Sequence, residues 1–181
     1  KNHYLSDFPF CFVGCLILFF LPIYKSTNLS LGIVPSLFLA FMINLCFTGV
    51  FAFVGFVLPT SKLLPKAYYK IKNPKLLNLI YKVIGVPVFR FFLMLLFWGR
   101  AKNRKKFFDG TRTGIRNFIY QTHQSEFGHL MAFIAINLVT IIMLYKGYST
   151  LLILTLGINI IGNFYPIILQ RHHRIRLKRF I

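Results

Sequence analysis

Acidic side chains are nearly missing from this sequence. Its 181 residues include three of them, Asp7, Asp109 and Glu126, against 22 Lys and Arg, which gives a formal net charge of +19. A soluble domain of this length carries acidic and basic residues in rough balance, so the composition argues against an ordinary soluble protein. Because the acids are so few, each one is a candidate for a specific role.

Cysteine is also scarce. The three cysteines, Cys11, Cys15 and Cys46, lie within apolar stretches, and the sequence has neither a Cys-x-x-Cys pair nor the Cys/His spacing of a zinc site. We therefore expect these cysteines to behave as small hydrophobic side chains.

Long apolar runs dominate the rest of the chain, which is 56% hydrophobic and contains 22 Phe. About 20 apolar residues are enough for a helix to cross a bilayer. Four runs come close to this length or exceed it: 8–24, 31–58, 127–145 and 148–169. The sequence therefore predicts an all-α integral membrane bundle of about four transmembrane helices, built as a single domain.

A strong positive charge is also typical of nucleic-acid-binding proteins. Such proteins do not need apolar runs of this length, so nucleic-acid binding is disfavoured.

The region between the second and third runs, residues 59–126, is strongly basic and holds 14 of the 22 Lys and Arg. Within it, residues 86–99 form an apolar stretch of 14 residues that contains Arg90. This stretch is too short for a comfortable span. We interpret it as an interfacial or re-entrant helical segment on the cytoplasmic side.

The distribution of charge predicts the orientation in the membrane. The short loops 25–30 and 146–147 carry one Lys each, whereas the middle region and the tail 170–181 together carry 19 Lys and Arg. Cytoplasmic segments of membrane proteins are enriched in Lys and Arg, and anionic lipids attract them. We expect a multi-pass protein of the bacterial inner (cytoplasmic) membrane, with membrane lipids as partners and both termini in the cytoplasm.

Glu126 stands where the third predicted span enters the membrane. His129 lies three residues later and His123 three residues earlier, so all three share one side of a helix. A carboxylate can orient a histidine and raise its basicity. A structural interpretation is equally open, with Glu126 complementing the helix N-terminus. A third is a metal site that also uses His172 or His173, although five histidines are too few for the pattern of membrane desaturases.

A second polar cluster ends the fourth predicted span. Asn163 and Gln170 are polar groups in or near an apolar run, and such groups usually face the interior of a bundle. Pro166 removes the N–H that would bond the carbonyl of residue 162. Three arginines follow: Arg171, Arg174 and Arg176. Guanidinium groups match phosphates well, but such a cluster can also be an ordinary cytoplasmic anchor.

Four segments of the chain resemble the glycosyl-4,4'-diaponeurosporenoate acyltransferase family. They are PKAYY (65–69), FFDG (107–110), QTHQSEFGHL (121–130) and NFYPIILQRHHRIR (163–176). The resemblance extends over about residues 59–181 and is most specific in the last segment. There the chain departs from the family pattern Gln-Arg-Tyr-Asn-Arg, because His172 and His173 replace the Tyr and Asn.

This resemblance implies a membrane acyltransferase that moves a fatty acyl group to a sugar hydroxyl of a glycosylated lipid or carotenoid. It implies no bound cofactor, with acyl-coenzyme A or a similar donor as co-substrate and a lipid-like glycoside as acceptor. The rival hypothesis is a non-catalytic accessory subunit of a larger inner-membrane complex, suggested by the small size and the few catalytic side chains.

The acyltransferase hypothesis assigns roles to the polar residues. We expect His129 to act as the general base, with Glu126 orienting it. The remaining candidates would bind the acyl donor's phosphates, the acceptor or the oxyanion: Asn163, Gln170, Arg171, Arg174, Arg176, Asp109 and His123. No residue is assigned to a metal. Asp109 precedes Gly110, and a turn role is the other interpretation of that pair.

Overall fold

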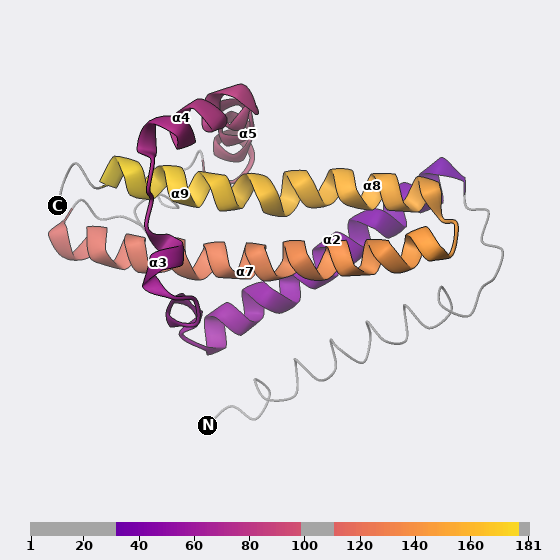
Figure 1. Cartoon of the computed structure of the whole chain (residues 1–181), viewed down its shortest axis with the longest axis horizontal. Coiled ribbons are helices and arrows are strands. Elements are labelled where there is room, and N and C mark those ends of the chain that lie inside the picture. The colour runs from indigo at the N-terminus through magenta and orange to yellow at the C-terminus, as the bar shows by residue number, and fades with distance from the viewer. Residues whose placement is uncertain (1–31, 99–110, 178–181) are drawn as a thin grey trace.

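The computed structural model describes residues 32–98 and 111–177, and these two ranges contain helices and short connections but no strand (Figure 1). The α-helices are α2 (Ile33–Val57), α3 (Lys66–Tyr69), α4 (Pro74–Val83), α5 (Val86–Leu93), α7 (Arg112–Tyr145), α8 (Ser149–Asn159) and α9 (Tyr165–Leu177). Short 3-10 or π segments complete them: η1 (Thr60–Lys62), η2 (Met94–Trp98) and η3 (Ile160–Phe164).

Three helices in the described part of the chain are long and apolar enough to cross a membrane. They cover Ile33–Gly55, Thr113–Tyr145 and Ser149–Leu177, the last running through α8, η3 and α9. The chain is thus an all-α membrane bundle, as the sequence predicted. The predicted first span, residues 8–24, lies outside the described residues.

Helix α2 nearly coincides with the predicted run 31–58, whereas the other two helices are longer than the predicted spans. Helix α7 begins at Arg112, well before the predicted residue 127, and α9 continues to Leu177 instead of ending near residue 169. Hydropathy detects only the apolar part of a helix. The polar start of α7 is fixed by an N-cap instead, because the Thr111 hydroxyl accepts from Gly114 N–H at 2.9 Å.

The core of the bundle is an antiparallel pair, α7 beside the continuous α8–α9 helix (Figure 1). The two are joined by a tight turn at Gly147, where φ is 73°, a left-handed conformation that suits glycine. Helix α2 packs against both. Near this turn the contacts are apolar, and the buried residues are Ala40, Ile43, Met143, Tyr148 and Leu151.

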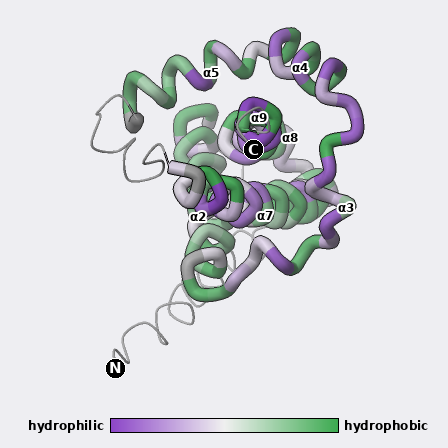
Figure 2. Tube along the Cα trace, turned by 90° about the vertical axis from the view of Figure 1, so that its left-hand side faces the viewer, coloured by the Kyte–Doolittle hydropathy of each residue, from purple (hydrophilic) through white to green (hydrophobic). Residues whose placement is uncertain are grey.

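Helices α3, α4 and α5 wrap around the other end of the bundle, where α9 ends (Figure 2). Asn73 caps α4 by accepting from Leu76 N–H at 3.0 Å. Gly85, at φ 73°, then allows a sharp change of direction, so that Pro74–Val83 and Val86–Leu96 are bent by 72°. Such a pair has the shape of a broken span or a re-entrant loop. The stretch predicted as interfacial or re-entrant is therefore helical and packs on α9.

Candidate active site

Glu126 lies at the centre of a buried ion cluster between α7 and α9. Its side chain is 0% exposed. One carboxylate oxygen, Oε1, accepts from Arg171 Nε at 2.7 Å, and the other, Oε2, accepts from Arg174 Nη2. Both oxygens of the single acid among the described residues are thus engaged by arginines of the closing sequence segment.

The length of α7 places this cluster at a membrane boundary. The turn at Lys146 joins two spans and therefore lies at one surface of the bilayer. Glu126 is nineteen residues from Tyr145, which corresponds to about 28 Å along a helix. The hydrocarbon layer is about 30 Å thick, so in a helix perpendicular to the bilayer Glu126 is level with the opposite boundary.

Two tyrosines of α3 cover the arginines. The Arg171 guanidinium carbon lies 4.7 Å from the centroid of the Tyr68 ring, and that of Arg174 lies 5.6 Å from the Tyr69 ring. The Tyr69 ring also stacks on His123 at 4.0 Å. These cation–π and stacking contacts fix the short helix over the ion cluster.

The contacts of α3 with the ion cluster also change the pKa values of Tyr68 and Tyr69, which lie outside the membrane-spanning helices. Burial, followed by the negative charge of Glu126, raises the pKa of Tyr69 to about 12. The same two causes, in the same order, raise the pKa of Tyr68. Both hydroxyls therefore stay protonated at neutral pH and can donate hydrogen bonds.

Arg174 has donors that no described residue uses. The residue is 4% exposed, and within residues 32–98 and 111–177 its Nε and Nη1 atoms have no hydrogen-bond partner. Buried donors usually have acceptors, because leaving them unsatisfied costs about 1–3 kcal/mol or more for a charged group. These atoms are suited to an acceptor oxygen on a ligand.

A chain of hydrogen bonds on the membrane side of Glu126 fixes the state of His129. Asn159 donates to the carbonyl of Phe133 at 3.2 Å, and its own Oδ1 accepts from Asn163 Nδ2 at 2.9 Å. The Asn163 Oδ1 atom therefore faces Thr48 Oγ1 at 3.1 Å and His129 Nδ1 at 3.0 Å. Because an amide oxygen only accepts, the hydrogen of the neutral imidazole lies on Nδ1 and the lone pair on Nε2.

The π segment η3 and Pro166 shape the helix opposite His129. Asn163 belongs to η3, and π segments inside helices often occur at functional sites. Pro166 lacks the N–H that an α-helix would place against the carbonyl of Gly162. The ring of His129 interacts with the backbone at Gly162, so the imidazole meets the irregular part of the span.

The predicted pairing of Glu126 with His129 is not a direct contact in this structure. Asn163, rather than Glu126, occupies the Nδ1 side of His129. The carboxylate instead holds the arginines. The two residues still share one side of α7, three positions apart, as the sequence predicted.

The other predicted site residues are distributed around this centre. Gln170 donates to Ser125 Oγ at 3.1 Å, and His123 lies against Tyr69. Arg176 is exposed and faces a separate pocket with α4. Asp109 lies outside the described residues. Among the described residues, no group of three His, Cys, Asp or Glu side chains is placed to hold a metal ion.

Four contributors to this site carried no role in the sequence analysis: Thr48, Tyr68, Tyr69 and Asn159. The signal for Asn159 was present, since Asn159 and Asn163 are polar residues four apart within an apolar run and so share a helix face. Thr48 carried no such signal, because a lone threonine in a span normally bonds its own helix.

Comparison with known proteins gives one match. The family model described as glycosyl-4,4'-diaponeurosporenoate acyltransferase matches residues 65–181, a range that contains α3, the ion cluster and the whole His129 network except Thr48. No curated protein and no solved structure matches the chain.

Proposed function

Since the chain belongs to the glycosyl-4,4'-diaponeurosporenoate acyltransferase family, we propose that it transfers a fatty acyl group from a thioester donor to a sugar hydroxyl of a glycosylated lipid or carotenoid. The observation that carries this proposal is the hydrogen-bonded chain from Phe133 through Asn159 and Asn163 to His129. It presents the imidazole with a basic Nε2, the atom that a hydroxyl nucleophile needs.

His129 is the proposed general base. It is partly exposed, and it lies about 24 Å from the level of Tyr145 along α7, just inside the boundary that Glu126 marks. A sugar attached to a lipid and a thioester with a long acyl tail both reach this depth. This depth supports a base that acts on both substrates.

Arg174 is proposed to stabilise the charge that develops on the carbonyl oxygen of the donor. Its unused Nε and Nη1 atoms are the donors for that oxygen. Glu126 is a positioning residue in this scheme, because it holds the guanidinium through Nη2. Tyr69 covers the opposite side of the same group.

The chemistry balances without a further reactant. Nε2 of His129 takes the proton of the sugar hydroxyl while the hydroxyl oxygen forms a bond to the thioester carbonyl carbon. The tetrahedral intermediate then breaks its carbon–sulfur bond, and the thiolate takes the proton from the imidazolium. The products are the sugar ester and the free thiol.

The membrane setting is part of the proposal. We expect the ion cluster to face the cytoplasm of a bacterial inner membrane, because most of the Lys and Arg within residues 32–98 and 111–177 lie at this end of the bundle. A coenzyme A thioester is cytoplasmic, so its reactive carbonyl reaches the boundary from that side.

The test is acyl transfer to the glycosylated carotenoid in membranes that contain the chain, with the ester product measured by mass spectrometry. His129→Ala should lower the rate by about 10²–10⁴. Asn137→Ala is the matched control, since Asn137 is polar, lies two turns further along α7 and bonds only its own helix at Phe133. Its rate should equal that of the wild type.

Wild-type transfer by a folded His129→Ala variant would remove His129 from the reaction. If the wild-type chain transfers no acyl group and purifies in a fixed ratio with another membrane protein, the accessory-subunit hypothesis replaces the enzyme.

A further inference from the structure

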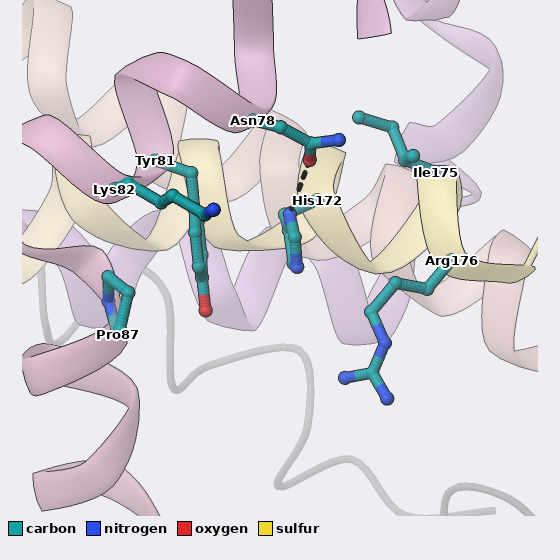
Figure 3. Close-up of a pocket in the computed structure, with 7 residues that line it drawn as sticks. All are labelled: Asn78, Tyr81, Lys82, Pro87, His172, Ile175 and Arg176. Carbon is teal, nitrogen blue, oxygen red and sulfur yellow. Dashed lines mark hydrogen bonds between the residues drawn. The ribbon is translucent and has the colours of Figure 1, made fainter. Parts of the chain in front are cut away.

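A pocket of about 420 Å³ lies between α4 and α9 (Figure 3). Asn78 and Lys82 line it from α4, and His172 and Arg176 line it from α9. In each pair the residues are four apart, so each helix turns one face to the pocket. Small-molecule sites in proteins have volumes of roughly 300–1,000 Å³.

The charge of this pocket is positive and uncompensated. Lys82 and Arg176 both line it. Arg90 of α5 interacts electrostatically with His172 at its wall. Glu126 is the single acid within residues 32–98 and 111–177, and Arg171 and Arg174 occupy both of its oxygens. The two cations of the pocket therefore have no carboxylate partner in that part of the chain.

The pocket also contains a buried hydroxyl without a partner. Tyr81 is 6% exposed, and its phenol oxygen bonds to no group in the described part of the chain. The Tyr81 ring stacks on His172 at 3.8 Å with an angle of 9° between the planes. The ring of His172 is held in turn by Asn78 Oδ1, 3.1 Å from Nδ1. A rigid aromatic wall thus carries an unused hydrogen-bonding group (Figure 3).

We propose that this pocket binds a phosphate group, with Lys82 and Arg176 as its cationic ligands and the Tyr81 hydroxyl as a neutral donor. Arginine and lysine together with a neutral donor are the usual ligands of phosphate oxygens. The pocket lies next to the membrane boundary defined by Glu126, because Arg171 and His172 are neighbours on α9. Two sources bring a phosphate there: the headgroup of an anionic lipid and a phosphorylated acyl donor such as coenzyme A.

The site is distinct from the proposed catalytic centre. Helix α9 directs Arg171 and Arg174 to Glu126 on α7, whereas His172 and Arg176 face α4. Binding at the pocket does not depend on acyl transfer. A His129→Ala protein that has lost activity should still bind, so failure of the two proposals can be told apart.

The experiment is calorimetric titration of the full chain in an uncharged maltoside detergent. The probes are coenzyme A and dihexanoylphosphatidylglycerol, with dihexanoylphosphatidylcholine as the lipid whose headgroup has no net charge. We expect at least one of the first two to bind the wild-type chain. Its affinity should fall as salt rises, because partly exposed charges are screened.

Variants assign the binding to the pocket. The double change Lys82→Gln and Arg176→Gln should weaken binding about tenfold or more, because two charged hydrogen bonds to the phosphate are lost. Tyr81→Phe, which removes one oxygen atom, should weaken it a few-fold by the loss of one neutral bond. Lys75→Gln is the matched control on α4, since Lys75 does not line the pocket, and it should bind as the wild type does.

Each result decides the proposal. Binding of coenzyme A alone identifies a donor subsite, and binding of phosphatidylglycerol alone identifies a lipid site. Binding of both supports a phosphate site that accepts either source. Failure of the wild-type chain to bind either probe overturns the inference, as does equal binding by the folded double variant. If that variant does not fold, an affinity unchanged in Tyr81→Phe and insensitive to salt overturns it as well.

Discussion

Neutralising Glu126 should destabilise the protein strongly, and mostly through one of its two partners. In Glu126→Gln both arginines lose their counter-charge. The Arg174 side chain is 5% exposed and that of Arg171 is 29% exposed, so water can solvate the second but not the first. Breaking a buried ion pair by removing one partner costs about 3–5 kcal/mol, and most of that cost should come from Arg174.

A double-mutant cycle measures this division. The free energy of unfolding is followed by circular dichroism as sodium dodecyl sulfate is added to mixed micelles. The coupling between Glu126→Gln and Arg174→Gln should be about 3 kcal/mol. The coupling with Arg171→Gln should be nearer to about 1 kcal/mol, the value for a more exposed pair. Arg116→Gln, an exposed change on the same helix, should not couple with Glu126→Gln.

Two outcomes would refute the reasoning. The ion cluster would be unimportant for stability if Glu126→Gln lowered the free energy of unfolding by less than about 1 kcal/mol, which is the range of exposed ion pairs. If the coupling energy of Glu126→Gln were larger with Arg171→Gln than with Arg174→Gln, burial of the arginine would not determine how much stability each ion pair contributes.

Three further changes test other parts of the structure. Gly128→Leu should lower the free energy of unfolding, measured in the same micelles, by about 1–3 kcal/mol. The reason is that a Cβ at Gly128 would already lie 3.4 Å from the Phe51 carbonyl oxygen of α2. Gly128→Ala, the control, should lower it much less. Pro166→Ala should slow acyl transfer roughly tenfold without lowering stability, since it restores an N–H opposite His129 and shifts the geometry of the site. The pKa of Tyr69 is about 12 in the folded protein against 10.0 for the free side chain. The protonated phenol of Tyr69 therefore adds to the free energy of unfolding below pH 10, and this contribution is lost as the pH rises through 12. Tyrosinate absorbance at 295 nm should accordingly differ between wild type and Tyr69→Phe only above about pH 11; a difference at pH 10 would contradict the raised pKa.

The membrane-spanning helices could be predicted because they depend on composition. A run such as 31–58 has no stable alternative to a membrane helix, and α2 fills it almost completely. Glu126 is one of three acids in a strongly basic chain, so the sequence singled it out as a site residue, but the partner expected for it was His129 and not an arginine. Because acidic residues are so rare in this chain, Glu126 could be chosen as a site residue without any knowledge of the fold.

The partner of His129 could not be predicted in the same way. Asn163 reaches it only because α7 and α9 run antiparallel in one particular alignment and because η3 widens the helix there. The sequence spacing of Glu126 and His129 suggested a contact within α7, but the two side chains use partners on the opposite helix. Tyr68 and Tyr69 stand in the segment PKAYY that carries the family resemblance, but the four residues of α3 are too few to show by periodicity which side chains they contact.

The polar contacts between α7 and its neighbour occur at successive levels along both helices. Asn159 meets Phe133, Asn163 meets His129 and Gln170 meets Ser125. A slip of one helix along the other by one turn, about 5.4 Å, would break all of these contacts and would leave Asn159 and Asn163 without partners in hydrocarbon, at several kcal/mol each. The long helical hairpin is therefore locked against sliding along its own axis.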